Sequence, residues 1–174
     1  SYLHNKNKKP MAFKNEFILI VLPISLKQSC DIIKVINELY NNNNKFFNSK
    51  TWILKPHPDL KLNSIESEFR DLFKVLKIEN QSVDSLIHKS GLVITNGSSV
   101  AIEAVVLGKP VCIIGAQNGL TQNPIPQNIN PGIWRLCYNE HDLYNYLTQI
   151  MLYRKQDYME LMEIGNKIKS EYFE

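Results

Sequence analysis

Short apolar runs without polar interruption alternate along this chain with segments whose apolar residues recur at helical spacing. Residues 17–23 read FILIVLP, the pattern of a strand buried on both faces. Behind it, Ile32, Val35, Ile36 and Leu39 have the spacing of an amphipathic helix. Strands of this kind, separated by helices, are typical of a parallel sheet covered on both faces. We therefore expect an α/β fold with a Rossmann-like, doubly wound, mainly parallel sheet of about five to six strands in three layers.

The same patterns place the other elements. We expect further strands over residues 51–55, 73–78, 92–95, 111–114 and 133–138, and helices over residues 29–40, 64–69, 82–89, 99–107, 140–152 and 157–172. Residues 41–44 are expected to form a polar loop, and Ser82 to be a helix N-cap. The loop over residues 115–132 is unusually long for a compact domain, which favours a functional role.

The length of 174 residues predicts one domain with its own core. We expect residues 1–16, which carry four lysines, to be a linker or arm, with a basic contact to a membrane or nucleic acid as the alternative. Residues 17–174 are then the Rossmann-like nucleotide-binding domain. A net charge of +3 is too small to predict a nucleic-acid partner.

Two further features of the sequence concern the cellular compartment of the protein. No apolar run approaches the roughly 20 residues that span a bilayer. The three cysteines have neither the even number of a disulfide framework nor metal-ligand spacing, which favours a reducing compartment. We expect the cytoplasm, with the inner face of the cytoplasmic membrane as an alternative for a full-length protein.

In such a sheet, ligands bind beyond the carboxyl ends of the strands. After the strand over residues 92–95, Asn96 and Gly97 predict a tight turn, because glycine accepts a positive φ and lets a ligand approach the backbone. Ser98 and Ser99 then open a helix whose free amide groups attract an anion. Glu103, one turn later on the same face, can accept hydrogen bonds from a ribose. The prediction is a phosphate and ribose site; the alternative is a serine N-cap beside a surface carboxylate.

A second candidate is His57, which follows the strand over residues 51–55 and lies between two prolines that restrict its backbone. At the carboxyl edge this histidine can donate to a phosphate or act as a general acid. Lys55 adds positive charge if it faces the same crevice. The alternative is a proline-limited loop with an incidental histidine.

Several common motifs are absent from the sequence. No Gly-x-Gly-x-x-Gly follows the first strand, and there is no Walker lysine motif, which disfavours nicotinamide, flavin and P-loop chemistry. No Gly-x-Ser-x-Gly occurs, so a serine hydrolase has no nucleophile elbow. No cluster of histidine, cysteine or carboxylate residues has metal-ligand spacing.

The order of these motifs resembles that of a known family. KPHP at residues 55–58, SSV at 98–100, the acidic Glu103 and LGKPV at 107–111 resemble the carboxyl-terminal donor domain of GT-B-type glycosyltransferases. The pattern is most similar to bacterial surface-polysaccharide transferases of the sialyl, Kdo and CDP-glycerol types. The LGKP segment also resembles the non-hydrolysing UDP-N-acetylglucosamine 2-epimerases.

The resemblance implies a nucleotide-activated sugar or polyol phosphate as substrate, with no metal or other cofactor. It assigns His57 to the donor phosphate and to assisting departure of the nucleotide. It assigns Gly97, Ser98 and Ser99 to the phosphate and Glu103 to the ribose. It further places Glu79 and Asn80 in the loop that reads the base, and Gln117 and Asn118, with Gln122, on the sugar or acceptor side.

One departure from the family concerns domain number. The family has two Rossmann-like domains with catalysis between them, whereas this chain has one, and it begins with Ser1 rather than Met. No carboxylate here is assigned as the general base. We therefore expect the donor half of a larger transferase, whose partners are an amino-terminal acceptor domain and a glycan acceptor, with peripheral membrane association as a further expectation. A 2-epimerase-like half and a non-catalytic nucleotide-binding module are the alternatives.

Overall fold

The computed structural model describes residues 16–129 and 131–173. The expected linker at residues 1–16 therefore lies outside the described residues except for Glu16. The strands are β1 (Phe17–Leu22), β2 (Trp52–Pro56), β3 (Lys77–Ile78), β4 (Ser90–Thr95), β5 (Val111–Ile114) and β6 (Trp134–Cys137). The helices are α1 (Leu26–Asn42), α2 (Asn44–Asn48), α3 (Leu62–Glu68), α4 (Arg70–Phe73), α5 (Val83–Lys89), α6 (Ser99–Val106), α7 (Glu140–Met151) and α8 (Lys155–Tyr172).

The six strands form one parallel sheet in the order β3-β2-β1-β4-β5-β6. Strand β1 lies at its centre, where Ile20 pairs with Leu54 of β2 on one side and with Ile94 of β4 on the other. This is the strand order of a Rossmann-like, doubly wound sheet. The expected fold class is confirmed.

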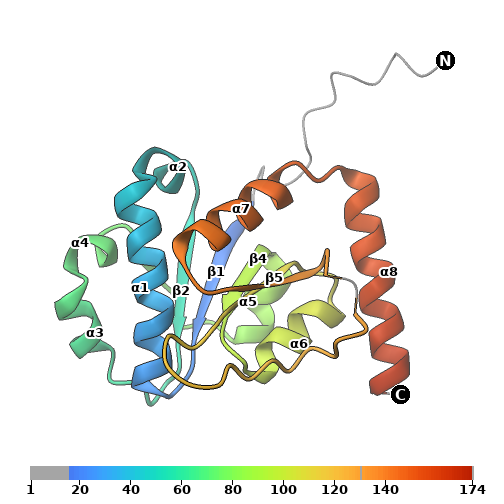
Figure 1. Cartoon of the computed structure of the whole chain (residues 1–174), viewed down its shortest axis with the longest axis horizontal. Coiled ribbons are helices and arrows are strands. Elements are labelled where there is room, and N and C mark those ends of the chain that lie inside the picture. Colours follow the sequence, from blue (N-terminus) through green and yellow to red (C-terminus); the bar gives the residue numbers. More distant parts are fainter. Residues whose placement is uncertain (1–15, 130, 174) are drawn as a thin grey trace.

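The sheet separates two hydrophobic layers. Ile18 and Ile20 of β1 belong to the layer packed against α1 and α7. Leu19 and Val21 face the opposite layer, which contains residues of α5, α6 and α8. Figure 1 shows the sheet between α1 at the left and α8 at the right. The uninterrupted apolar run of β1 follows from this double burial.

The expected strand over residues 73–78 is wrong for most of its length. Only Lys77–Ile78 is a strand, and Phe73 ends helix α4. Phe69, Leu72, Phe73 and Leu76 are all buried, but only Leu72 and Phe73 lie in α4, because Phe69 precedes that helix and Leu76 follows it. These four side chains pack into the core from a short helix and the residues beside it, which leaves only Lys77 and Ile78 to pair with β2.

The expected loop over residues 41–44 is also shorter than predicted. Helix α1 runs to Asn42 and α2 begins at Asn44, so the polar run is mostly helical. The packing of α2 explains why this polar run is helical. The buried Phe47 ring of α2 stacks on Trp52, with 4.1 Å between ring centroids. The Trp52 Nε1–H also donates to the Phe47 carbonyl oxygen at 2.9 Å. By contrast, Ser82 is an N-cap as predicted, accepting from the Ser85 amide.

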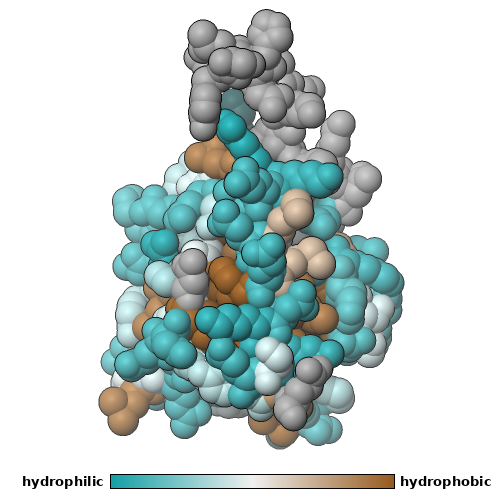
Figure 2. Space-filling view, turned by 90° about the vertical axis from the view of Figure 1, so that its right-hand side faces the viewer, coloured by the Kyte–Doolittle hydropathy of each residue, from teal (hydrophilic) through white to brown (hydrophobic). Residues whose placement is uncertain are grey.

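Helix α8 lies on the outside of the layer that contains α5 and α6. Figure 2 shows this side of the molecule, which is largely hydrophilic with some hydrophobic side chains visible near its middle. The helix approaches α6 closely at Gly165, which is buried. A Cβ at Gly165 would lie 2.5 Å from the Val106 carbonyl oxygen and 2.7 Å from that of Val105. Within the described ranges, no helix is long and apolar enough to cross a membrane.

We predict that Gly165→Ala destabilises the fold by about 1–3 kcal/mol, because the added methyl group forces α8 away from the α6 backbone. Helix propensity alone favours alanine over glycine by about 1 kcal/mol. The sign of the change in unfolding free energy therefore tests whether the packing against α6 is close. Thermal or denaturant unfolding measures it. The adjacent, exposed Asn166→Ala is the control, with a change within about 0.5 kcal/mol. A stabilised Gly165→Ala protein contradicts the close approach of the two helices.

Candidate functional site

The sheet has a switch point between its neighbouring strands β1 and β4. The chain leaves β1 into α1 on one face and leaves β4 into α6 on the other, so a crevice opens beyond their carboxyl ends. All the predicted site residues follow strands at this edge. His57 follows β2, Glu79 and Asn80 follow β3, residues 97–103 follow β4, and Gln117 and Asn118 follow β5.

The turn after β4 leads directly into α6. Ser98 occupies the N-cap position, but its side chain makes no capping hydrogen bond. Its hydroxyl lies instead 3.2 Å from the Thr95 hydroxyl. Ser99 is exposed at the first position of the helix. The simple capping alternative therefore does not describe Ser98, and no serine side chain occupies the amide groups of the first turn.

Gly97 is needed for a different reason from the predicted one. Among the described glycines, a positive φ occurs at Gly108 and Gly119, so the expected positive φ at Gly97 is wrong. A Cβ at Gly97 would clash with the Gln122 carbonyl oxygen. The missing side chain lets the backbone of the loop after β5 cross the turn after β4, which joins these two loops at the crevice.

His57 is held at the end of β2 by its backbone. Its N–H donates to the Leu22 carbonyl oxygen at 3.0 Å, which ties it to the end of β1. Its ring Nδ1 accepts from the Asp59 backbone N–H at 3.2 Å, so the neutral ring carries its proton on Nε2. The side chain is 40% exposed. Nε2–H is thus the donor that the ring can offer to an anion at this edge.

The loop after β3 is organised by two lysines. Lys77 Nζ lies 2.7 Å from the Glu79 carboxylate, and this hydrogen bond lowers the Glu79 pKa. Lys55 Nζ donates to the Asn80 carbonyl oxygen at 3.4 Å. Lys55 therefore reaches the loop after β3, and its positive charge stabilises that loop.

The predicted sugar-side residues fix the loop after β5. Gln117 Nε2 donates to the Tyr138 carbonyl oxygen at 2.8 Å, and Lys27 Nζ from α1 donates to the Asn118 carbonyl oxygen at 3.3 Å. These contacts attach the loop to β6 on one side and to α1 on the other. Both residues are exposed. Their observed bonds are structural, and a role toward a sugar stays a prediction.

Glu103 lies on α6 one turn beyond Ser99 and is exposed. Its carboxylate makes no hydrogen bond or ion pair within the described part of the chain, so its oxygens can accept from a ligand. Across residues 16–129 and 131–173, no hydrogen bond joins His57, the serines and Glu103 to one another. The topology brings the segments that carry them to one edge of the sheet.

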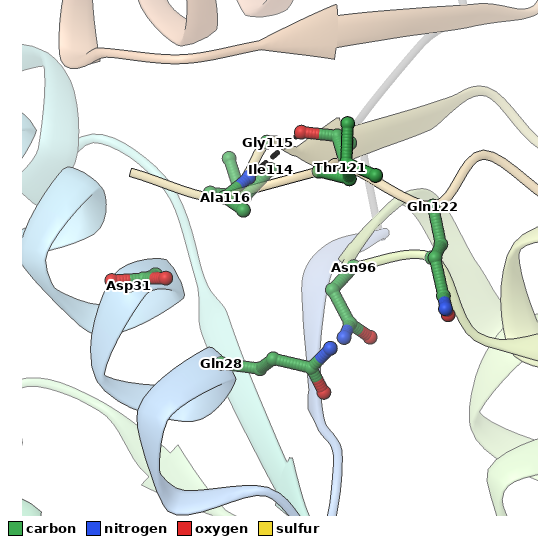
Figure 3. A pocket seen from close by; sticks show the side chains of 10 residues that line it. Gln28, Asp31, Asn96, Ile114, Gly115, Ala116, Thr121 and Gln122 are labelled. Carbon is green, nitrogen blue, oxygen red and sulfur yellow. Dashed lines mark hydrogen bonds between the residues drawn. The ribbon is translucent and has the colours of Figure 1, made fainter. Parts of the chain in front are cut away.

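A small cavity at the switch point was not predicted. We call it the switch-point cavity; it is lined by Gln28 and Asp31 of α1, Asn96 after β4, and Thr121 and Gln122 of the loop after β5 (Figure 3). Its volume is about 20 Å³. The available sequence signal was Asp31, a charged residue four positions before the apolar Val35 on the buried face of α1.

A larger cavity of about 540 Å³ lies at the opposite edge, next to α8. Leu107, Pro110 and Met162 contribute to its apolar lining. Burial lowers the pKa of Lys109 there, and its Nζ donates to the Ser90 carbonyl oxygen at 2.8 Å. Ligands of doubly wound sheets bind at the carboxyl edge, so this cavity is not the candidate site. No group of three or more metal-ligating side chains gathers in the described residues.

Comparison with known proteins finds similar folds among solved structures. No protein-family model matches the chain, and no curated protein matches it by sequence. Among solved structures, a UDP-GlcNAc 2-epimerase from Neisseria meningitidis bound to UDP-GlcNAc is 21% identical, with a TM-score of 0.57 over 90% of this chain and 44% of that chain. TarM of S. aureus, in complex with fondaparinux, alpha-GlcNAc-glycerol and UDP, is 16% identical, with a TM-score of 0.62 over 95% of this chain and 34% of that chain. The glycosyltransferase SnogD from Streptomyces nogalater is 13% identical, with a TM-score of 0.56 over 91% of this chain and 42% of that chain.

These similarities show the fold. The neighbours include glycosyltransferases and UDP-GlcNAc 2-epimerases with similar scores. This chain spans less than half the length of each of the three.

We predict that Gly97→Ala loosens the loop after β5, because the new methyl group displaces the Gln122 backbone. Such overpacking costs about 1–3 kcal/mol of unfolding free energy. Limited proteolysis within residues 115–129 and thermal unfolding are the measurements. Ser99→Ala, an exposed change in the same turn, is the control and leaves both nearly unchanged. Equal protease resistance of Gly97→Ala and the original chain contradicts the close approach.

Proposed function

We propose that this chain binds a nucleotide-activated sugar or polyol phosphate as the donor half of a glycosyltransferase that builds a surface polysaccharide or lipopolysaccharide. One observation carries the proposal: the carboxyl edge combines a histidine donor, a serine-rich turn opening α6, and an unpaired carboxylate one turn later. Neighbours of the same fold are solved with UDP or UDP-GlcNAc. The remainder of the enzyme would supply the acceptor domain and the general base.

The proposed chemistry is stabilisation of the departing nucleotide. The amide groups and positive end of α6 attract the diphosphate, and the hydroxyls of Ser98 and Ser99 add donors. His57 Nε2–H donates to the phosphate as negative charge develops on it. Glu103 accepts from the ribose hydroxyls, and the loop with Glu79 and Asn80 meets the base. Charge stabilisation by these groups requires no metal ion.

The second candidate function is sugar-nucleotide 2-epimerisation. It is favoured by the UDP-GlcNAc 2-epimerases among the neighbours, which match this chain as well as the glycosyltransferases do. Both reactions require binding of the nucleotide and stabilisation of its phosphate. They differ in the fate of the sugar, which the groups at this edge do not decide.

We predict that a nucleotide perturbs the backbone amide resonances of Gly97, Ser98 and Ser99. The chain is titrated with UDP, UMP, CDP, CMP and ADP. A cytidine preference favours sialyl, Kdo or glycerophosphate donors, and a uridine preference favours hexose transfer or epimerisation. If no nucleotide moves these resonances, the proposed function is wrong.

We further predict that replacing Ser98 and Ser99 together by Ala weakens nucleotide binding by roughly tenfold, since hydrogen bonds to charged groups contribute about 1.5–3 kcal/mol. His57→Ala is expected to weaken binding similarly by removing the Nε2 donor. Calorimetric titration measures both. Ser170→Ala, on the exposed face of α8, is the control. Unchanged affinity in the serine and histidine variants argues against the phosphate site.

The two candidate reactions separate in the full-length enzyme. With a sugar nucleotide and no acceptor, an epimerase inverts the sugar at C2, which the ring proton couplings report. A transferase releases the nucleotide in step with glycosylation of a labelled acceptor. Release of nucleotide that depends on the acceptor, without C2 inversion, supports the transferase, and C2 inversion without an acceptor supports the epimerase.

A further inference from the structure

Ser98 occupies the N-cap position of α6 without capping the helix. The other two serine N-caps of the described residues, Ser25 and Ser82, each accept a hydrogen bond from the backbone amide three positions further on. Ser98 makes no such bond, and its hydroxyl lies 3.2 Å from the hydroxyl of Thr95 instead. The contact with Thr95 therefore takes the place of the usual cap.

The surroundings of the two hydroxyls fix the direction of their hydrogen bond. Thr95 is fully buried at the end of β4, whereas Ser98 is half-buried. Within the described part of the chain, the Thr95 hydroxyl has no other hydrogen-bond partner. If it accepted from Ser98, its own hydrogen would be buried without an acceptor, which is costly. Thr95 therefore donates to Ser98 Oγ, and the hydrogen of the Ser98 hydroxyl remains free for another acceptor.

Backbone donors at the start of α6 are left open by the same contact. The amides of Ser99 and Val100 make no hydrogen bond within residues 16–129 and 131–173, whereas the Ala101 amide donates to the Ser98 carbonyl oxygen at 3.1 Å. A Ser98 hydroxyl released from Thr95 would be free to accept from the amides of this first turn, as serine does at an ordinary N-cap. The Thr95 contact thus keeps the serine and the amides from satisfying one another.

We propose that Thr95 is a positioning residue of the phosphate site. By donating to Ser98 Oγ, it prevents that oxygen from capping α6 and keeps both the serine hydrogen and the free amides available to a phosphate. Two hydroxyl groups in series also strengthen the outer hydrogen bond, because each bond polarises the next. Thr95 itself is buried and acts only through Ser98. This inference rests on the proposed function, in which a nucleotide phosphate binds at this turn.

The test is a double-mutant cycle between Thr95→Val and Ser98→Ala, with the affinities for UDP and CDP measured by calorimetric titration. Thr95→Val keeps the shape of the side chain and removes its hydroxyl. We expect it to weaken nucleotide binding roughly fivefold in the original chain, since hydrogen bonds to charged groups are the stronger ones. In the Ser98→Ala chain we expect the same change to alter the affinity by less than about twofold, because the residue through which Thr95 acts is gone. Thr95→Ser keeps the hydroxyl and is expected to restore most of the affinity.

Thr148→Val is the matched control, because it removes a threonine hydroxyl that donates to the Tyr144 carbonyl oxygen within α7; it is expected to keep the original affinity. Circular dichroism checks that each variant folds, and Thr95→Ala repeats the comparison if the valine variant does not. The inference is overturned if Thr95→Val keeps the affinity, or if it weakens binding equally with and without the Ser98 hydroxyl. It is also overturned if Thr95→Ser binds as weakly as Thr95→Val. If neither nucleotide binds the original chain, the proposed function itself fails, and this inference with it.

Discussion

The burial of β1 on both faces is the constraint on which the rest of the structure depends. Ile18, Leu19 and Ile20 are fully buried, which is feasible only if helices cover the two sides of the strand and other strands pair with both edges. Pairing with β2 and β4 satisfies the edges. The same arrangement sends α1 and α6 to opposite faces. The crevice at the carboxyl ends of β1 and β4 is therefore a geometric consequence of how the core is covered.

The loops at that crevice are held by a small number of polar contacts and one close approach. Gly97 allows the backbone at Gln122 to cross over the turn, and Lys27 and Gln117 attach the same loop to α1 and to β6. A ligand at this edge would thus meet backbone groups whose positions are set before binding. Such preorganisation is what an electrostatic phosphate site requires.

The proposed donor site divides into parts with different chemistry. The start of α6 and His57 provide hydrogen-bond donors and partial positive charge, which suit a diphosphate. Glu103 provides an acceptor, which suits the hydroxyl groups of a ribose. The α6 turn and the switch-point cavity are adjacent because Asn96 belongs to both. Neighbouring folds solved with UDP-GlcNAc make a nucleotide sugar the natural probe of this arrangement.

Local patterns in the sequence determined the α/β class, the approximate strands and helices, and the loops that carry His57 and residues 97–103. These features follow from local periodicity and from the rule that ligands bind at the carboxyl edge. Tertiary packing decided the rest. Phe69, Leu72, Phe73 and Leu76 pack into the core from α4 and the residues on either side of it, so the predicted third strand shortened to two residues. Gly97 is required by a backbone that follows β5, and Asp31 and Asn96 line one cavity only through the order of the strands. Contacts between residues far apart in sequence set these features, and local patterns carry no information about such contacts.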